Sequence, residues 1–168
     1  MKSILGRTII AVVAAAAIGL PSAVAVEVLN PGRTPYHVND YAELMSIGDR
    51  SAIEKVLRDV QNGPLKVEIV VTTFSSSGKL SPDEFMTRYI RKWVRIFFLE
   101  NHRRIHVIVF AGEPSLVRLG VGKPLMRKLT AKRSSEIVDT LIIPRLAQGQ
   151  AGDGVMEGLR AIIEEISK

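Results

Sequence analysis

The pattern of apolar and polar residues beyond position 45 predicts a helix followed by a strand. Ser46 with Asp49 resembles a capping box, and the apolar residues after it recur at helical steps of three and four. Asn62-Gly63-Pro64 ends this helix. The β-branched run from Lys66 to Phe74 predicts a strand, and its continuous apolar centre indicates burial on both faces.

A second helix and two more strands follow in the pattern. The helix begins with a strong start signal and runs through Trp93, with Ser81 as N-cap, Pro82 at its first position and Glu84 completing a capping box. Arg104 to Ala111 predicts a second strand. After the turn at Gly112-Glu113-Pro114, Ser115 to Val121 predicts a third strand that pairs with it in a hairpin.

The order of these elements indicates the fold class. Two helices complete the chain, one over Ser134 to Ala147 that Pro144 kinks or ends, and one from Asp153, as N-cap, to Ser167. The first two strands are joined through a helix, which makes them parallel, and the third is antiparallel. We therefore expect an α/β fold: a mixed sheet with helices packed on both faces, a Rossmann-like α/β/α sandwich.

The first 25 residues have the three parts of a secretory signal peptide. Lys2 and Arg7 form a charged region, Thr8 to Leu20 an apolar region, and Ala23-Val24-Ala25 a cleavage site. The alternative is an uncleaved anchor, but a spanning helix needs about 20 apolar residues. We expect a periplasmic or secreted protein after cleavage near Ala25, with a signal peptide over 1–25, an extended leader over 26–35 and one domain over 36–168.

Composition narrows the chemistry that the chain can perform. Removing Lys2 and Arg7 lowers the basic count from 23 to 21 against 17 acidic residues, so the net charge falls from +6 to +4. This mild excess suits anionic lipid or an acidic partner and does not require nucleic acid. The chain has no cysteine, which excludes disulfides, a thiol nucleophile and cysteine-ligated metals. None of these features predicts an oligomeric state.

Several short stretches, in their order along the chain, resemble the TPM domain family. They cover roughly residues 36–166 and include Val38–Ala42, Glu68–Thr73, Arg91–Trp93, Gly120–Gly122, Ile143–Arg145 and the glycines at 149, 152, 154 and 158. The family includes a thylakoid-lumen protein and many exported bacterial proteins. The resemblance implies an α/β fold, a site for a divalent metal and an acid phosphatase activity.

The chain departs from the family where the metal site is expected. Family members carry Asp-Asn-Gly before the second strand and Gly-Tyr-Gly-Leu-Glu after the third, whereas this chain has Arg103-Arg104-Ile105 and Gly120–Pro124. Of the family's acidic positions that can be placed in this chain, only Asp40 is still acidic, and we expect Arg103, Arg104 and Lys123 to lie near it. Calcium or magnesium wants several oxygen ligands. We therefore expect no cofactor, with Asp40 as the residue that a calcium or magnesium site would use.

Two basic clusters are candidate binding surfaces. In the first, residues 88–98 place four basic side chains on one helical face beside aromatic residues at 89, 93 and 97: Arg88, Arg91, Lys92 and Arg95. Such a helix can lie on an anionic membrane, or its aromatics can be core and its arginines solvated. The second cluster follows the third strand and comprises Lys123, Arg127, Lys128, Lys132 and Arg133.

Other catalytic patterns fail on inspection. His102 and His106 are four residues apart, but a loop and a strand do not align them, and we expect these and His37 to be solvated or hydrogen-bonded. Gly120–Lys123 resembles part of a phosphate-binding loop, but Pro124 and Val117 break the motif. The serines at 75–77 have no base placed to activate them.

The sequence therefore favours an exported, non-catalytic accessory or binding module at the cell envelope. Its partner would be an acidic protein or an anionic membrane surface, and export argues against nucleic acid. The alternative is a phosphatase-like hydrolase that depends on a divalent metal bound at Asp40. A structural subunit of an envelope assembly would have the same sequence features.

Overall fold

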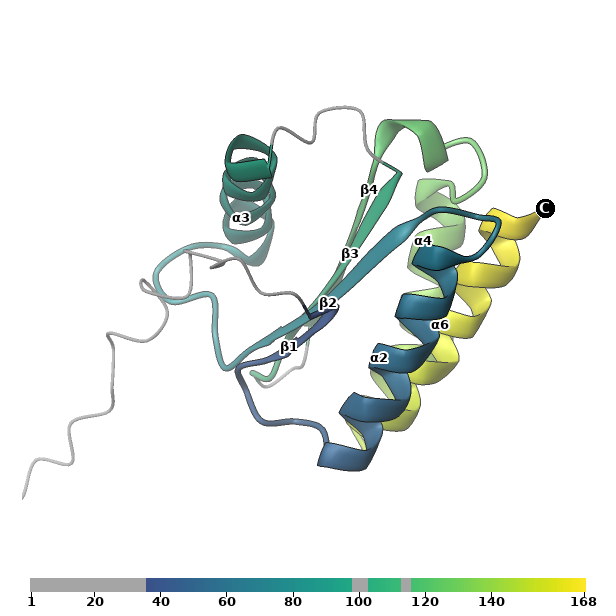
Figure 1. The fold of residues 1–168 in the computed structure, drawn as a ribbon. Helices are drawn as coiled ribbons and strands as arrows, with labels where there is room; N and C mark the ends of the chain where they lie inside the picture. Colours follow the sequence, from purple (N-terminus) through teal and green to yellow (C-terminus); the bar gives the residue numbers. More distant parts are fainter. Residues whose placement is uncertain (1–35, 98–102, 113–115) are drawn as a thin grey trace, which may run out of the picture.

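Four strands form one sheet in the order β1-β2-β3-β4 (Figure 1). The computed structural model describes residues 36–97, 103–112 and 116–168. β1, β2 and β3 are parallel, and β4 is antiparallel to β3, which confirms the mixed sheet. The strands are Val38–Asp40 (β1), Glu68–Phe74 (β2), Arg104–Phe110 (β3) and Leu116–Val121 (β4).

Helices cover both faces of this sheet. In Figure 1, α3 lies alone on one side, whereas α2, α4 and α6 lie on the other. The helical segments are α2 (Ile47–Asn62), α3 (Pro82–Phe97), the 3₁₀ turn η1 (Lys123–Leu125), α4 (Ala131–Ile137), the π-helical η2 (Val138–Ile142), α5 (Ile143–Leu146) and α6 (Ala151–Ser167). The α/β class predicted from the sequence is confirmed. None of the helices in the described ranges has the length and apolar character needed to cross a membrane.

The alternation of side chains along the strands divides the interior into two cores. On one face, Val71, Val107 and their neighbours pack against α2 and α6 in the larger core. On the other face, a small aromatic cluster joins the sheet to α3, and it consists of Phe74, Phe85, Tyr89, Ile108 and Phe110. Burial on both faces explains why consecutive residues are apolar over Ile69–Val71 of β2 and Val107–Phe110 of β3.

The strand β1 was not predicted, because it has only three residues and two of them, Asn39 and Asp40, are polar. Its pairing with β2 is nevertheless fixed, with Asp40 opposite Thr73 in the register. The segment before it is held by a buried histidine: His37 Nδ1 lies 2.8 Å from Glu54 Oε1 on α2. Hydrogen bonds from His37 and Val38 to Glu54, rather than an apolar pattern, therefore position this edge strand.

Local capping explains where two helices begin. The capping box between Ser46 and Asp49 at the start of α2 is present as predicted. α4 begins three residues before the predicted Ser134, because the Thr130 hydroxyl accepts the Arg133 N–H at 3.2 Å. The prediction of Asp153 as N-cap of the last helix was wrong, because α6 begins at Ala151 and Asp153 lies in its first turn.

Pro144 does not end its helix. α4, η2 and α5 follow one another without a break, and the Ile143 N–H donates to the Val138 carbonyl five residues back. A proline ring cannot donate and clashes with the carbonyl four residues before it. The chain widens into a π-helical turn immediately before Pro144, and such turns are rare and often occur at functional sites.

Candidate functional site

Asp40 supports the loop that joins β1 to α2. Its Oδ1 accepts the Thr73 hydroxyl at 2.6 Å and the Leu44 N–H at 3.0 Å, and its Oδ2 accepts the Met45 N–H at 3.0 Å. These three hydrogen bonds use most of the roughly four acceptor positions of an ionised carboxylate. These contacts give Asp40 a structural role, because they hold the β1–α2 loop against β2.

The basic residues expected beside Asp40 lie at the other end of the sheet, which corrects the expectation. Asp40 follows β1, at the carboxyl end of the parallel strands, whereas Arg104 opens β3 opposite Glu68. Lys123 follows the antiparallel β4 and so lies near Arg104, since the Gly122 N–H donates to the Arg104 carbonyl at 2.9 Å. Asp40 is not neutralised by these cations.

The residues present do not fit the divalent metal that the family resemblance implies. Within residues 36–97, 103–112 and 116–168, no three histidine, aspartate or glutamate side chains group closely enough to hold an ion. Glu68, the acid nearest Arg104, accepts the Arg104 Nε–H at 2.8 Å.

A buried polar cluster lies between the sheet and α3. Thr72 and Tyr89 hydroxyls lie 3.1 Å apart, and the Tyr89 ring meets the His106 ring edge-on with centroids 6.2 Å apart. Burial, with the nearby Arg104 charge, lowers the pKa of His106 to about 3. His106 is therefore a neutral core residue, and His102 lies outside the described residues.

The first basic cluster lies on α3 and is only partly available. Arg91 is exposed and Lys92 is half-buried, while Arg88 pairs with Glu84 on the next turn at 2.7 Å. Arg95 lies on α3, but its side chain, like that of Trp93, is outside the described part. Tyr89 is buried in the aromatic cluster, so the interpretation of this aromatic position as core is supported.

The second basic cluster divides into free and engaged side chains. Lys123 and Arg127 are exposed, and neither is in an ion pair within the described ranges. Lys128 donates to the Ile166 carbonyl at 3.0 Å and so holds the end of α6. Lys132 is 89% exposed on α4 and lies 4.0 Å from Glu136.

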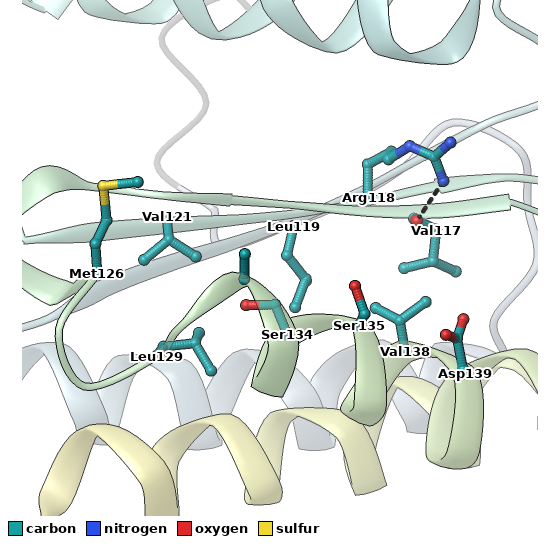
Figure 2. A pocket seen from close by; sticks show the side chains of 11 residues that line it. Val117, Arg118, Leu119, Val121, Met126, Leu129, Ser134, Ser135, Val138 and Asp139 are labelled. Carbon is teal, nitrogen blue, oxygen red and sulfur yellow. Dashed lines mark hydrogen bonds between the residues drawn. The ribbon is translucent and has the colours of Figure 1, made fainter.

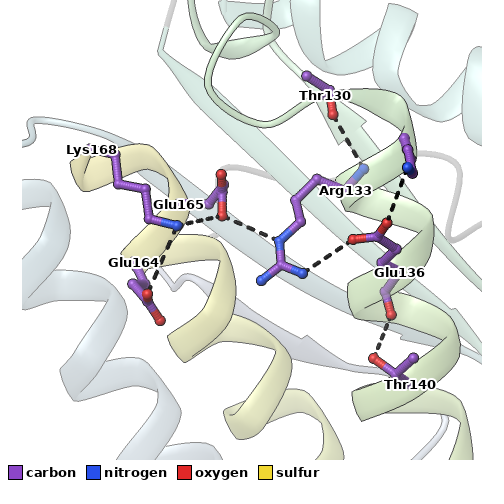
Figure 3. Close-up of polar contacts among 8 residues, drawn as sticks. Thr130, Arg133, Glu136, Thr140, Glu164, Glu165 and Lys168 are labelled. Carbon is purple, nitrogen blue, oxygen red and sulfur yellow. Dashed lines mark hydrogen bonds and ion pairs between the residues drawn. The ribbon is translucent and has the colours of Figure 1, made fainter.

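Arg133 belongs to the structure of the domain rather than to a binding surface. Figure 3 shows its guanidinium between α4 and α6, donating to Glu136 and Glu165, each at 3.2 Å. These bonds raise its pKa above the usual value, that to Glu136 most. Lys168 donates to the same Glu165 at 3.0 Å. The available positive charge therefore comes from Lys123, Arg127 and Lys132.

The segment that carries these three cations also lines a cavity, through Met126, Leu129 and Ala131, that the sequence did not reveal. It has a volume of about 370 Å³ and separates β4 from the segment that carries η1, α4 and η2 (Figure 2). Val117, Leu119 and Val121 of β4 form one wall, and Leu129, Ser134 and Val138 form the other. The alternation of Val117, Leu119 and Val121 in β4 predicts that one face of this strand is apolar. It does not show whether a helix or a cavity lies against that face.

Comparisons with known proteins support one family. No curated protein matches the chain. The solution NMR structure of the N-terminal domain of a protein from P. gingivalis is similar over 79% of this chain and 82% of that one, with 23% identity and a TM-score of 0.69. The N-terminal domain of a Corynebacterium glutamicum protein covers 80% of this chain and 82% of its own at 13% identity and a TM-score of 0.57.

These two structures share the fold, and the sequence itself carries the family. The model of the TPM domain matches residues 38–165, from the first residue of β1 to the last turn of α6. That range includes the whole sheet and every helix described above except the last two residues of α6. The chain therefore belongs to the TPM domain family.

Proposed function

We propose that this TPM domain is an exported, non-catalytic binding module of the cell envelope that binds an acidic partner. The observation that carries the proposal is the group of exposed cations after β4, Lys123, Arg127 and Lys132, which the domain leaves largely without acidic partners. Charges of one sign at one end of a sheet attract a ligand of opposite charge and speed its association. The signal-peptide pattern of residues 1–25 supports export.

The hydrogen bonds of Asp40 support a non-catalytic role. A hydrolase of the alternative kind would need that carboxylate to bind a metal with several further oxygen ligands. Three of its roughly four acceptor positions are already used by the β1–α2 loop and Thr73, and no group of three ligating side chains occurs among the described residues. Lys123, directly after β4, lies at the far end of the sheet, so it would not join Asp40 in one site.

Charge reversal tests the binding role. We expect Lys123→Glu with Arg127→Glu to weaken binding of a fluorescent polyglutamate at least tenfold, because attraction becomes repulsion. The matched control is Arg88→Glu with Arg91→Glu on α3, which changes the net charge equally and should have a smaller effect. Titration of the chain purified from expressing cells gives both affinities. Equal losses in the two double variants would contradict a local site.

A turnover assay on the same preparation tests the alternative. We expect no hydrolysis of p-nitrophenyl phosphate with millimolar calcium or magnesium. Turnover that requires the ion and disappears in Asp40→Asn, with the thermal midpoint recorded for that variant, would overturn the non-catalytic proposal in favour of the phosphatase.

A further inference from the structure

Among the residues that the structure describes, β4 has a neighbouring strand on one side only, β3. It is at the edge of the sheet. Gly122, directly after β4, forms a hydrogen-bonded pair with Arg104 of β3. Such pairs alternate along an antiparallel ladder, so the register makes Gly120 and Arg118 face β3 with their backbone groups. The N–H and C=O groups of Leu119 and Val121 therefore point away from β3, toward the open edge.

One end of this edge is already closed. The Arg118 guanidinium donates to the Val117 carbonyl at 3.1 Å and also pairs with Asp83 of α3. On the outer side of Leu119 and Val121, no other strand of the described residues pairs with β4. The open backbone is therefore the half of β4 that leads to Lys123.

The cavity lies beside this open half. Figure 2 shows Val117, Leu119 and Val121 pointing from β4 toward the helical wall, with Met126 near one end and Asp139 near the other. A strand added beside β4 would turn every second side chain to the same face of the sheet. Its apolar side chains would reach the cavity, while its backbone met Leu119 and Val121.

A buried hydroxyl in the cavity wall has no hydrogen-bond partner in the described part of the chain. Ser134 is 9% exposed, and its Oγ makes no hydrogen bond to any residue that the structure describes. Buried polar groups nearly always have a partner, so an exception calls for an explanation. Ser134 lies one turn before the π-helical η2, in the wall that faces β4. An occupant that carries a polar group would satisfy it.

We propose that β4 accepts an extended segment of an acidic partner protein as a fifth strand. The backbone of the segment pairs with Leu119 and Val121, its alternate apolar side chains enter the cavity, and a polar group meets Ser134. Its acidic residues lie against Lys123 and Arg127. Main-chain pairing supplies affinity and the pockets supply specificity, as in other strand-addition complexes. This inference rests on the proposed binding function and names the chemistry of the partner.

The test uses labelled peptides and the chain purified from expressing cells. The probe is a ten-residue peptide in which valine alternates with threonine, with three glutamates at one end, made once with the acids at each terminus. The control peptide has the same sequence with every second amide N-methylated, on the edge that would face β4, which removes the backbone donors on that edge. We expect one orientation to bind, the methylated form to bind at least tenfold more weakly, and hydrogen exchange at the Leu119 and Val121 amides to slow.

Two substitutions separate this proposal from a general basic surface. Ser134→Ala should weaken the peptide about fivefold, equivalent to one ordinary hydrogen bond, without lowering the thermal midpoint of the free domain. Leu119→Pro removes an outward N–H, which an edge strand tolerates, and should abolish binding while the melt remains cooperative. Where proline unfolds the domain, the methylated peptide decides.

The possible failures are distinguishable. Peptide binding that ignores N-methylation and Ser134→Ala but is lost in the Lys123 and Arg127 reversal would overturn the fifth strand and leave the proposed function standing. Binding to anionic phospholipid vesicles without binding to either peptide would overturn the protein partner. If the wild-type protein binds neither the peptides nor polyglutamate, both proposals are overturned.

Discussion

At the scale of single residues, the most unusual group is His106. It lies in the middle of the α3 side of β3, with Tyr89 across from it and Arg104 two residues before it in the same strand. Burial and the arginine charge lower its pKa to about 3 from an ordinary 6.5. The folded domain therefore excludes a proton that the unfolded chain accepts readily.

This exclusion predicts an acid-sensitive fold. Below about pH 6.5 the unfolded histidine binds a proton and the folded one does not, so the free energy of unfolding falls as pH falls, by up to about 1.4 kcal/mol per pH unit. Urea unfolding at pH 7, 6, 5 and 4 measures the slope. His106→Leu should reduce the slope by up to about 1.4 kcal/mol per pH unit, which corresponds to one proton. This holds whatever the substitution does to the free energy of unfolding at pH 7. An unchanged slope would assign the acid sensitivity to carboxylates such as Glu54.

Glu54 contributes in the same direction. Burial raises the pKa of this carboxyl, but the hydrogen bonds from His37 and from the backbone N–H groups of His37 and Val38 outweigh it and hold the pKa below its usual value. Its contribution is present at neutral pH and is lost as pH falls through the lowered pKa. The comparison of wild type with His106→Leu isolates the histidine, because Glu54 is the same in both.

At the scale of elements, the segment from α4 to α6 depends on close approach. A Cβ at Gly158 of α6 would lie 2.5 Å from Cδ1 and Cγ1 of Ile142, the last residue of η2. Ile142 is fully buried. The absence of a side chain at Gly158 therefore allows the π-helical turn to pack against α6.

A double-mutant cycle tests this contact. We expect Gly158→Ala to cost about 1–3 kcal/mol by overpacking and Ile142→Ala about 2–5 kcal/mol by leaving a cavity. The double variant should lose less than the two costs together, because the added methyl occupies the vacated space. Chemical denaturation of all four proteins measures the coupling. Simple additivity would mean that the side chain of Ile142 moves aside freely.

The sequence predicted most elements because their signals are local. Ser46 and Ser81 cap helices by accepting backbone N–H groups three residues later in the sequence. The burial of β2 follows from a run of β-branched residues. β1 escaped prediction because its pairing depends on Glu54 and Thr73, which are distant in sequence. The cavity at β4 escaped for the same reason, since only the tertiary structure shows that α4 stands away from the strand.

At the scale of the whole molecule, the two ends of the sheet have different chemistry. Asp40 and its loop lie at the carboxyl end of the parallel strands, and the cations after β4 lie at the opposite end. The family resemblance suggested that acidic and basic residues would meet at one end. Only strand direction separates them, and a motif comparison contains no information about the distance between motifs in space.

The fate of the N-terminus is a prediction for the whole chain. We expect the protein isolated from an expressing bacterium to begin at Val26, because the pattern of residues 1–25 is that of a cleaved signal. Mass spectrometry of the intact protein measures this. The matched variant is Ala25→Pro, which should block cleavage and retain the first 25 residues. A native protein that keeps Met1 and remains with the membrane would support the uncleaved anchor.

The sheet that separates the two cores also affects how the sequence can change. The aromatic cluster under α3 and the larger core under α2 and α6 lie on opposite faces of the same strands. Substitutions in groups that share no partner add their effects independently. A lineage can therefore exchange the residues of the α3 layer, including any surface it presents, without compensating changes beneath α2 and α6.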